Sequence, residues 1–198
     1  MQILTARKNL RLKVTDKQAD ILVGCVLGDA YITKLGKIQI EQSAAQTEYI
    51  NWKYNQLKSI SYGPPVKPVS RYDKRYDKTF YSYRFWTRQY FRSWREKFYM
   101  ENKKIFSLNN LSPLSLAVWY MDDGSLNEGK GAILSTESFS QEDREKIKNL
   151  FIKDFNIKPS FKKQGKMIIG TKDSKKFFSI IRPYVIPSMQ YKLQPRND

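Results

Sequence analysis

The sequence contains no histidine and a single cysteine, Cys25, among its 198 residues. The absence of histidine excludes any catalytic triad that uses it, a histidine general base and every zinc site that contains it. One cysteine can form neither an intramolecular disulfide nor a cysteine-cluster metal site. Any catalysis therefore depends on carboxylates, lysines, hydroxyl groups and metal ions that prefer oxygen ligands.

Long apolar runs are also missing, since no stretch approaches the roughly 18 consecutive apolar residues that a membrane-spanning helix needs. The first residues lack the apolar region and the small-residue cleavage site of a signal peptide. We therefore expect no membrane association and no secretion. The single cysteine fits a reducing compartment.

Positive charge is in excess, because 36 Lys and Arg residues against 19 Asp and Glu residues give a formal net charge of +17. With 40% hydrophobic and 14% aromatic residues, the chain has enough apolar side chains to form a core. The charge therefore belongs to a folded protein and not to a disordered basic tail. A polyanion is the expected partner.

Helix and strand patterns alternate along the chain in an order that recurs. Residues 1–110 and residues 111–198 each read as helix, strand, helix, hairpin, helix. In the second half, Ser140 and Asp143 form an acidic variant of the capping box at the start of a helix. The repeat predicts a mixed α+β fold of two related units, each of which must bury its apolar helix.

Two apolar helices, one in each half, end in an aspartate. Residues 22–30 read LVGCVLGDA and residues 116–124 read LAVWYMDDG, and they align without a gap, so that Asp29 corresponds to Asp123. If the helices pack side by side, both carboxylates lie at helix C-termini, where the dipole disfavours negative charge by about 0.3–1 kcal/mol each. One or two Mg²⁺ ions would remove both penalties. Solvated caps are the alternative interpretation, which the apolar character of both helices disfavours.

Two glycines of the first helix also suggest close helix packing. Gly24 and Gly28 lie four residues apart and therefore on one face, where they permit a neighbouring backbone to approach. Val118 and Asp122 occupy the corresponding places in the second helix, so we expect a contact that is not symmetric.

The two segments resemble the LAGLIDADG motif of homing endonucleases, in the single-chain form with two motifs. The Pro-Ser-Met-Gln-Tyr-Lys-Leu sequence at residues 187–193 extends the resemblance to the subgroup of the yeast mitochondrial omega-intron endonuclease. The resemblance covers roughly residues 15–193. It implies an α+β fold with two pseudo-symmetric αββαββα units, packed through the two motif helices and forming a β-saddle for double-stranded DNA.

The implied function is that of a site-specific double-strand DNA endonuclease, encoded by an intron, which hydrolyses phosphodiesters in a long asymmetric target. The resemblance also implies a monomer, Mg²⁺ as the cofactor with Mn²⁺ as a substitute, and an origin in a mitochondrion, a chloroplast or a prokaryotic cytoplasm. Two alternatives stay open: a maturase that binds its own intron RNA, and a catalytically silent DNA-binding protein of the same fold. Two acids retained in otherwise apolar helices favour cleavage.

The resemblance also assigns site residues. In the family, the last acid of each motif ligates Mg²⁺. The metal site implied here comprises the ends of both motifs: Gly28, Asp29, Asp122 and Asp123. A lysine is implied near each active centre, namely Lys104, with Lys103 as the alternative, and Lys192. With the two aspartates, Lys104 and Lys192 form the predicted catalytic set.

Recognition of DNA is expected to come from the sheets, because a two-stranded ribbon fits the major groove and alternate side chains share one face. Arginine and lysine can read guanine, glutamine can read adenine and glutamate can accept from cytosine. Contact with phosphate or water alone is the alternative for each of them. The polar residues predicted to bind DNA are Lys37, Gln39, Glu41, Arg71, Arg75, Ser82, Arg84, Lys130, Ser135, Lys158, Ser160, Lys162 and Lys166. We expect the aromatic residues of the segment 72–86 mainly in the core beneath the helices, with base stacking on single strands as the alternative.

Overall fold

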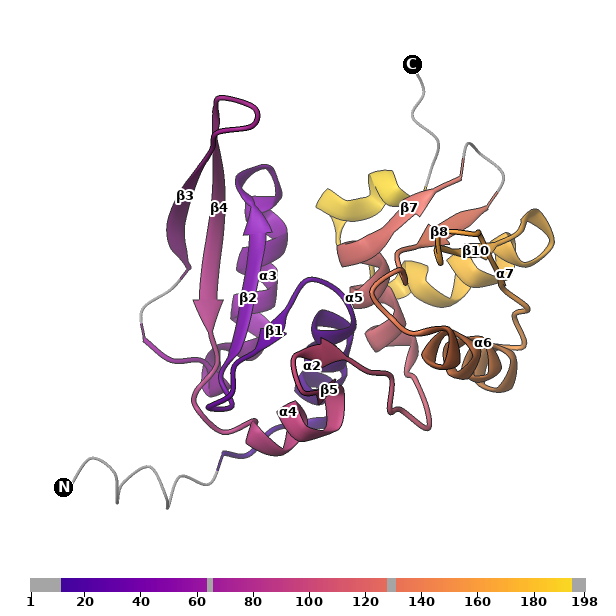
Figure 1. Ribbon diagram of the computed structural model, residues 1–198, viewed down its shortest axis with the longest axis horizontal. Helices are drawn as coiled ribbons and strands as arrows, with labels where there is room; N and C mark the ends of the chain where they lie inside the picture. Colours follow the sequence, from indigo (N-terminus) through magenta and orange to yellow (C-terminus); the bar gives the residue numbers. More distant parts are fainter. Residues whose placement is uncertain (1–11, 64–65, 128–130, 194–198) are drawn as a thin grey trace. The chain divides into compact units, whose positions relative to one another are not determined.

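The computed structural model describes residues 12–63, 66–127 and 131–193 (Figure 1). By their contacts, these residues form two compact units. The first unit contains residues 12–19 and 31–95, and the second contains residues 20–30 and 96–193.

These units divide the chain differently from the predicted halves, 1–110 and 111–198. The difference arises because most of the first motif helix packs with the second half of the chain. The repeat boundary at residue 110 stays a prediction.

The order αββαββα occurs twice, as the resemblance implies. The first series is α2 (Asp16–Leu27), β1 (Tyr31–Ile32), β2 (Ile38–Ser43), α3 (Thr47–Leu57), β3 (Lys67–Asp73), β4 (Lys78–Trp86) and α4 (Arg92–Phe98). The second series is α5 (Pro113–Asp123), β7 (Gly124–Leu126), β8 (Ala132–Leu134), α6 (Gln141–Phe155), β9 (Ser160–Phe161), β10 (Met167–Ile169) and α7 (Thr171–Ile181). The short strands β5 (Tyr99–Met100) and β6 (Lys103–Lys104) connect the two series. The α+β fold is therefore confirmed.

Local hydrogen bonds fix where two helices of the second series begin. Ser140 Oγ accepts from the backbone N–H of Asp143 at 3.0 Å, as the capping box predicts. At the start of α5, Ser112 Oγ accepts from the N–H of Ser115 at 3.0 Å, and Pro113 occupies the first helical position. The second motif therefore begins at a defined residue.

The sheet of the first unit has the strand order β1-β2-β4-β3, and all neighbours are antiparallel. The side chains of Ile38 and Ile40 on β2 are buried on the face that packs against α3. On the same face, the ring of Phe85 meets Tyr54 of α3 edge to face, with centroids 5.4 Å apart. The alternate residues of the central strands therefore lie on the opposite face.

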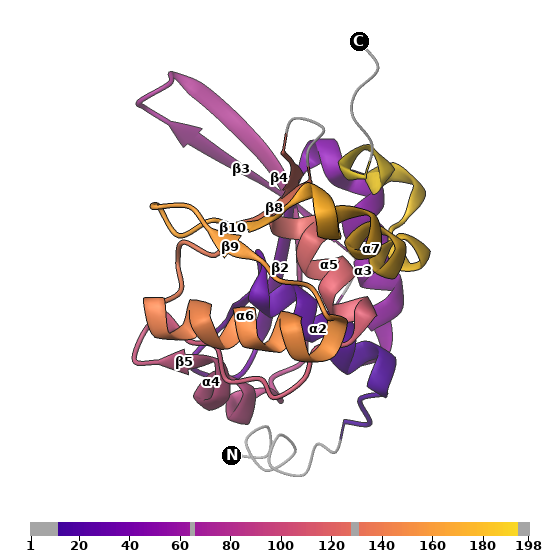
Figure 2. The ribbon, with the colours of Figure 1, turned by 90° about the vertical axis from the view of Figure 1, so that its right-hand side faces the viewer.

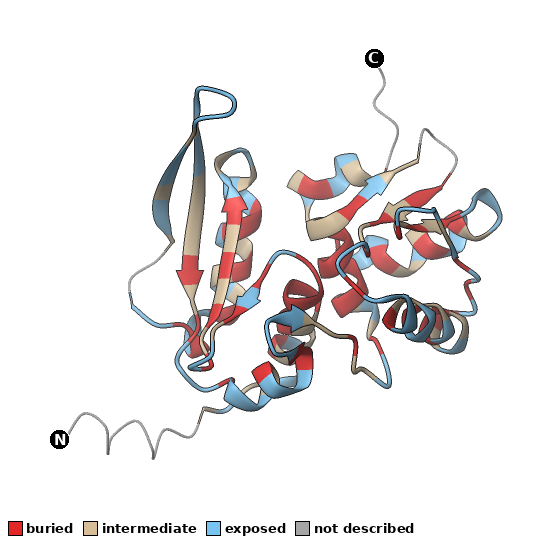
Figure 3. Ribbon diagram, viewed as in Figure 1, coloured by how far each residue is buried: buried red, intermediate tan, exposed pale blue. Residues whose placement is uncertain are grey.

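The outer part of the β3–β4 hairpin differs from the prediction. Tyr72, Tyr76, Phe80 and Tyr81 are exposed, and only Phe85 of the predicted aromatic core is fully buried (Figure 3). The reason is geometric, because α3 covers the inner end of this long hairpin and ends before its outer residues. The expectation of a mainly aromatic core here is wrong.

The second unit has a sheet in the order β7-β8-β10-β9 and three long helices beside it (Figure 2). Leu134, Met167 and Ile169 are fully buried on its inner face. Helix α5 lies in the core, since Trp119 contacts Phe151 of α6 and Tyr120 contacts Phe177 of α7, both edge to face. This packing holds the second motif rigidly. Within the part of the chain that the structure describes, no helix is long and apolar enough to cross a membrane.

Candidate functional site

The two motif helices lie side by side and run in the same direction within the second unit. Near their beginnings, Ser115 Oγ of α5 donates to the carbonyl oxygen of Asp20 at 2.8 Å. Near their ends, the backbone N–H of Asp29 donates to Oδ2 of Asp122 at 3.4 Å. The C-terminal ends of both motifs therefore meet, as their alignment predicts.

The glycines of α2 receive the larger residues of α5. A Cβ atom added to Gly24 would lie 2.5 Å from the carbonyl oxygen of Ser115 and 2.6 Å from Cβ of Val118. A Cβ added to Gly28 would lie 2.6 Å from Cβ of Asp122. Because all three distances are far below normal van der Waals contact, only glycine fits at these two positions of α2. The contact is asymmetric, as predicted. The two helix surfaces complement each other, because small residues of α2 face larger residues of α5.

Three carboxylates gather where the motifs end. The side chain of Asp29 is exposed, and those of Asp122 and Asp123 are half-buried. Burial, together with the charges of Asp29 and Asp122, raises the pKa of Asp123 to about 7, although Lys104 and Lys192 oppose that shift. The site therefore concentrates negative charge at helix C-termini, where the dipole also disfavours it.

Two lysines bind the ends of the motif helices at equivalent points. Lys104 Nζ donates to the carbonyl oxygen of Gly28. Lys192 Nζ donates to the carbonyl oxygens of Met121 and Asp122, at 2.6 and 3.1 Å. Gly28 and Asp122 occupy the same position of the two motifs, so each motif end has its own lysine. The structure thus brings both predicted lysines to the predicted aspartates.

Lys104 reaches the site and its alternative, Lys103, does not make this contact. The side chain of Lys103 is exposed, because neighbouring residues of the short strand β6 point in opposite directions. Burial lowers the pKa of Lys104, and the charges of Asp123, Asp29 and Asp122 act in the opposite direction. The ammonium of Lys104 is thus partly desolvated beside the carboxylates.

Tyr120 is a further residue of the site that sequence reasoning missed. Its hydroxyl donates to the carbonyl oxygen of Lys192 at 2.9 Å, and burial raises its pKa. The bond ties the 3₁₀ segment Pro187–Lys192 to the second motif helix. Tyr120 takes the place of Val26 in the first motif, and a hydroxyl-bearing ring in an otherwise apolar motif is the signal that could have identified it.

The side chains at the motif ends fit Mg²⁺. Mg²⁺ is usually held by one or two carboxylates and keeps several waters, and Asp29 and Asp123 supply two carboxylates. Among the described residues, no group of three or more Asp, Glu or Cys side chains is arranged to hold a metal. The carbonyl oxygens of Gly28 and Asp122 accept from lysines, and the metal roles predicted for these two residues stay predictions.

Five of the predicted DNA-binding residues share one face of the first sheet. Glu41 lies directly opposite Arg84 on the neighbouring strand. Ser82 and Arg71 belong to the same face, because Ser82 pairs with Ser43 and Arg71 pairs with Phe80. Gln39, two residues before Glu41, completes the set. This face, the one away from α3, we call the polar face of the first sheet.

Lys37 and Arg75 lie outside this ladder. Lys37 precedes β2, and its backbone N–H donates to Oγ1 of Thr33 at 3.0 Å. Arg75 lies in the turn of the β3–β4 hairpin, where its guanidinium forms an exposed ion pair with Asp73 at 2.7 Å. Both cations belong to the first unit, at opposite ends of its sheet.

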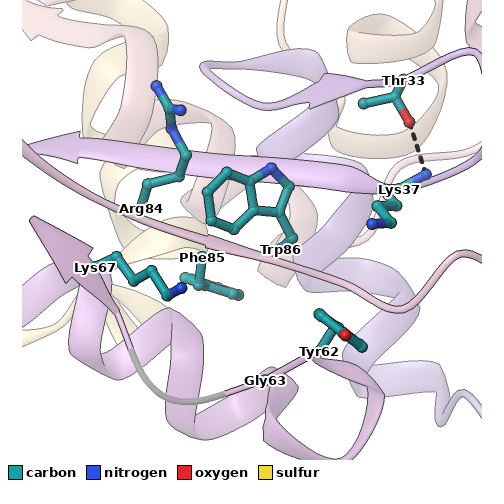
Figure 4. A pocket seen from close by; sticks show the side chains of 8 residues that line it. All are labelled: Thr33, Lys37, Tyr62, Gly63, Lys67, Arg84, Phe85 and Trp86. Atoms are coloured by element: carbon teal, nitrogen blue, oxygen red, sulfur yellow. Dashed lines mark hydrogen bonds between the residues drawn. The ribbon is translucent and has the colours of Figure 1, made fainter. Parts of the chain in front are cut away.

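A cavity of about 290 Å³ opens where β3 separates from β4 (Figure 4). Its lining combines three cationic side chains with aromatic rings and contains no carboxylate. The guanidinium of Arg84 lies over the ring of Trp86, 5.4 Å from its centroid, and Lys37 Nζ lies 5.3 Å from the centroid of Tyr62. The lining residues are Thr33, Lys37, Tyr62, Gly63, Lys67, Arg84, Phe85 and Trp86. This corner of the sheet is therefore strongly cationic.

The predicted DNA-binding residues of the second sheet lie mostly at strand ends, because the strands are shorter than predicted. Only Ser160 is within a strand, where it is exposed and pairs with Ile168. Ser135 follows β8, and its N–H donates to the carbonyl oxygen of Asp123 at 3.2 Å.

The lysines of this group flank β9 and β10. Lys158 and Lys162 are exposed on either side of β9, and Lys166 precedes β10 and lies 3.5 Å from Glu137. Lys130 lies outside the described residues.

Comparison with known proteins identifies relatives along nearly the whole chain. Residues 19–177 match the model of the LAGLIDADG DNA endonuclease family. A probable intron-encoded endonuclease 1 from Wickerhamomyces canadensis is 31% identical over 89% of the chain and 83% of its own length. The cytochrome b mRNA maturase bI2 of Saccharomyces cerevisiae is 31% identical over 87% of the chain.

A solved structure of a homing endonuclease is also similar to this chain. The homing endonuclease I-WcaI, bound to its DNA recognition sequence, superposes with a TM-score of 0.85 and 28% identity, covering 98% of this chain and 93% of that one. The chain spans about half the length of other relatives, 46% of the yeast maturase and 48% of a RecA protein from Mycolicibacterium flavescens.

Proposed function

The chain belongs to the LAGLIDADG DNA endonuclease family, and from this premise we propose that it is a site-specific double-strand DNA endonuclease. The observation that carries the proposal is the paired arrangement at the motif ends. Asp29 and Asp123 each lie beside a carbonyl group that holds a lysine ammonium. Two such half-sites suit the hydrolysis of two phosphodiesters, one on each strand.

In the proposed mechanism, Asp29 and Asp123 would hold Mg²⁺, which when bound supplies Lewis acidity toward the phosphate and an activated water. The lysines contribute positive charge next to the phosphate. Lys104 and Lys192 are fixed by carbonyl oxygens at 3.1 Å or less, so their ammonium groups need little reorganisation when charge develops on the phosphate oxygens. The hydroxyl of Tyr120 keeps Lys192 in place by donating to the backbone carbonyl oxygen of Lys192.

We propose that the enzyme acts as a monomer on a long asymmetric duplex. One chain carries both motifs, and the side chains on the two sheets differ, so the two halves of the target need not be symmetric. Mn²⁺ is expected to replace Mg²⁺, because both accept carboxylate and water ligands. The names of the yeast relatives, a cytochrome b mRNA maturase and an intron-encoded endonuclease, support an intron of an organelle genome as the source.

Binding of its own intron RNA is a second candidate function. The similarity to a yeast mRNA maturase over 87% of the chain favours it, and a net charge of +17 suits either nucleic acid. In that case the carboxylates would be idle. An aspartate variant should then still bind the intron RNA and support splicing, and a wild-type protein that does not bind its intron RNA would contradict this role.

One experiment tests the endonuclease proposal. The protein selects duplexes from a randomised pool in EDTA, and the recovered duplexes are then incubated with Mg²⁺. We expect a defined sequence and cleavage of both strands. A defined sequence without cleavage would identify a silent DNA-binding protein, and no duplex preference at all would overturn the proposal.

A further inference from the structure

The carboxylate of Glu41 lies at the centre of the polar face of the first sheet. Ser82 Oγ and Arg84 Nε, both on β4, donate to it at 2.6 Å each. Arg71 Nη2, on β3, donates at 3.0 Å, and Gln39 Nε2 is 3.4 Å away. Side chains from three neighbouring strands therefore converge on one carboxylate.

This environment argues against direct reading of a base by Glu41. A carboxylate offers about four acceptor positions, and the donors around Glu41 already use them. Its side chain is 15% exposed. Burial alone would raise the pKa of Glu41, but hydrogen bonds from Ser82 and Arg84 and the charges of both arginines lower it overall. Glu41 is thus ionised at neutral pH, and accepting from cytosine would require it to release a charged partner.

The arginines, in contrast, keep donors to offer. Arg84 contacts Glu41 through Nε and Nη2, and its guanidinium also rests over the ring of Trp86. A guanidinium carries five N–H donors in a rigid plane, and within the described part of the chain Nη1 of Arg84 is left to bind another acceptor. Arg71 is anchored through Nη2 and its side chain is 61% exposed. Glu41 thus holds Arg84 by two nitrogens and Arg71 by one on the polar face.

Resting on the proposed function, we propose that Glu41 is a positioning residue for target recognition, which holds Arg71 and Arg84 so that they read adjacent guanines. Guanine O6 and N7 form the pair of acceptors that an oriented guanidinium recognises best. Arg84, whose side chain is 18% exposed, also lines the cationic cavity in Figure 4, which lies where a polyanion is attracted. A glutamate that only stabilised the sheet would affect unfolding and leave base preference unchanged.

Selection from a randomised duplex pool in EDTA tests this proposal with three proteins: the wild type, Glu41→Gln and the control Glu48→Gln. Glu48 is an exposed carboxylate in the first turn of α3, so E48Q changes the net charge by the same amount as E41Q. We expect wild type and E48Q to recover the same sequence. E41Q should lose base preference at a few adjacent positions only, with at least tenfold less discrimination between the selected and a random duplex.

Affinity for the random duplex supplies the readout that a structural role would not give. Removing one negative charge should leave that affinity unchanged or raise it. Arg84→Lys, which keeps the charge but loses the planar fork, should lose preference at a subset of the positions lost by E41Q. If E41Q does not fold, Glu41→Asp replaces it, because the shorter side chain should not reach both arginines. This variant should lose base preference at the same few adjacent positions.

Two results separate the proposals. If the wild type recovers no sequence, the proposed function fails before any variant is compared. If the wild type recovers a sequence and E41Q retains all of it, Glu41 is not a positioning residue. Loss of preference by R84K at positions that E41Q still reads would overturn the inference equally.

Discussion

Gly28 and Asp122 occupy the same position of the two motifs and face each other, since a Cβ added to Gly28 would lie 2.6 Å from Cβ of Asp122. The contact connects fold and chemistry, because the next residue in each motif is the proposed metal ligand. The separation of the two helices at the ends that carry both aspartates depends on this missing side chain, as it depends on Gly24 further along the same contact.

Gly28→Ala should therefore lower both stability and cleavage. Forcing a methyl group into a packed contact costs about 1–3 kcal/mol, which lowers Tm by about 2–10 °C in a chain of this size. Thermal unfolding followed by circular dichroism measures the change. Gly170→Ala is the matched control, because a Cβ there meets nothing within 4 Å. An equal loss of Tm in both variants would contradict the close helix contact.

Asp29→Asn and Asp123→Asn should each abolish cleavage in Mg²⁺ while DNA affinity stays within roughly tenfold, because most phosphate contacts remain. Gel-shift titration in EDTA and cleavage of the selected duplex measure the two properties. Glu145→Gln removes an exposed carboxylate of α6 and should cleave normally. Cleavage at the wild-type rate by either aspartate variant would show that the site is elsewhere.

The titration of Asp123 predicts how stability depends on pH in the absence of metal. Its pKa is raised to about 7, so the folded state favours the protonated form. The stabilisation is fully present below the pKa of the unfolded chain, about 3.9 for aspartate, and is lost as pH rises through about 7. Asp123→Asn removes this loss. In EDTA, the Tm of the variant should exceed that of the wild type at pH 8 by at least about 3 °C and approach it near pH 4. Parallel Tm curves across this range would contradict the raised pKa.

Lys104→Met and Lys192→Met should slow the cutting of different strands. Each lysine belongs to one motif end, and removing a preorganised positive group typically costs about 10²–10³-fold in rate. Duplexes labelled on one strand at a time show which strand is cut, and nicked product should accumulate. Lys103→Met, which changes the exposed neighbour of Lys104, serves as the control. If both strands slow equally in K104M and in K192M, the assignment of one lysine per strand is wrong.

The sequence predicted the elements whose signals are local. The bounds of α5 follow from Pro113 and Asp123, and Ser140 marks the residue before α6. Strands β1 and β7 were missed by the residue pattern, because two or three residues cannot show an alternation, and only the family resemblance implied them.

Other features depend on contacts between distant segments. The choice between Lys103 and Lys104 needs the carbonyl oxygen of Gly28, 76 residues away. Glu41 was predicted to bind DNA, and its ion pair with Arg84, which lies 43 residues further on in the sequence, could not be foreseen. The partners in each contact, Gly28 with Lys104 and Glu41 with Arg84, lie too far apart in the sequence for a local pattern to connect them.

The complementary contact between the motifs also bears on the history of the gene. Two identical copies of the second half would place Val118 against Val118 and Asp122 against Asp122, with no glycine to receive either side chain. If the two halves arose by duplication, the ancestral pairing was not that of two second motifs as they stand here. The second half needs a partner with small residues at these two positions, so a symmetric dimer of second halves is sterically excluded.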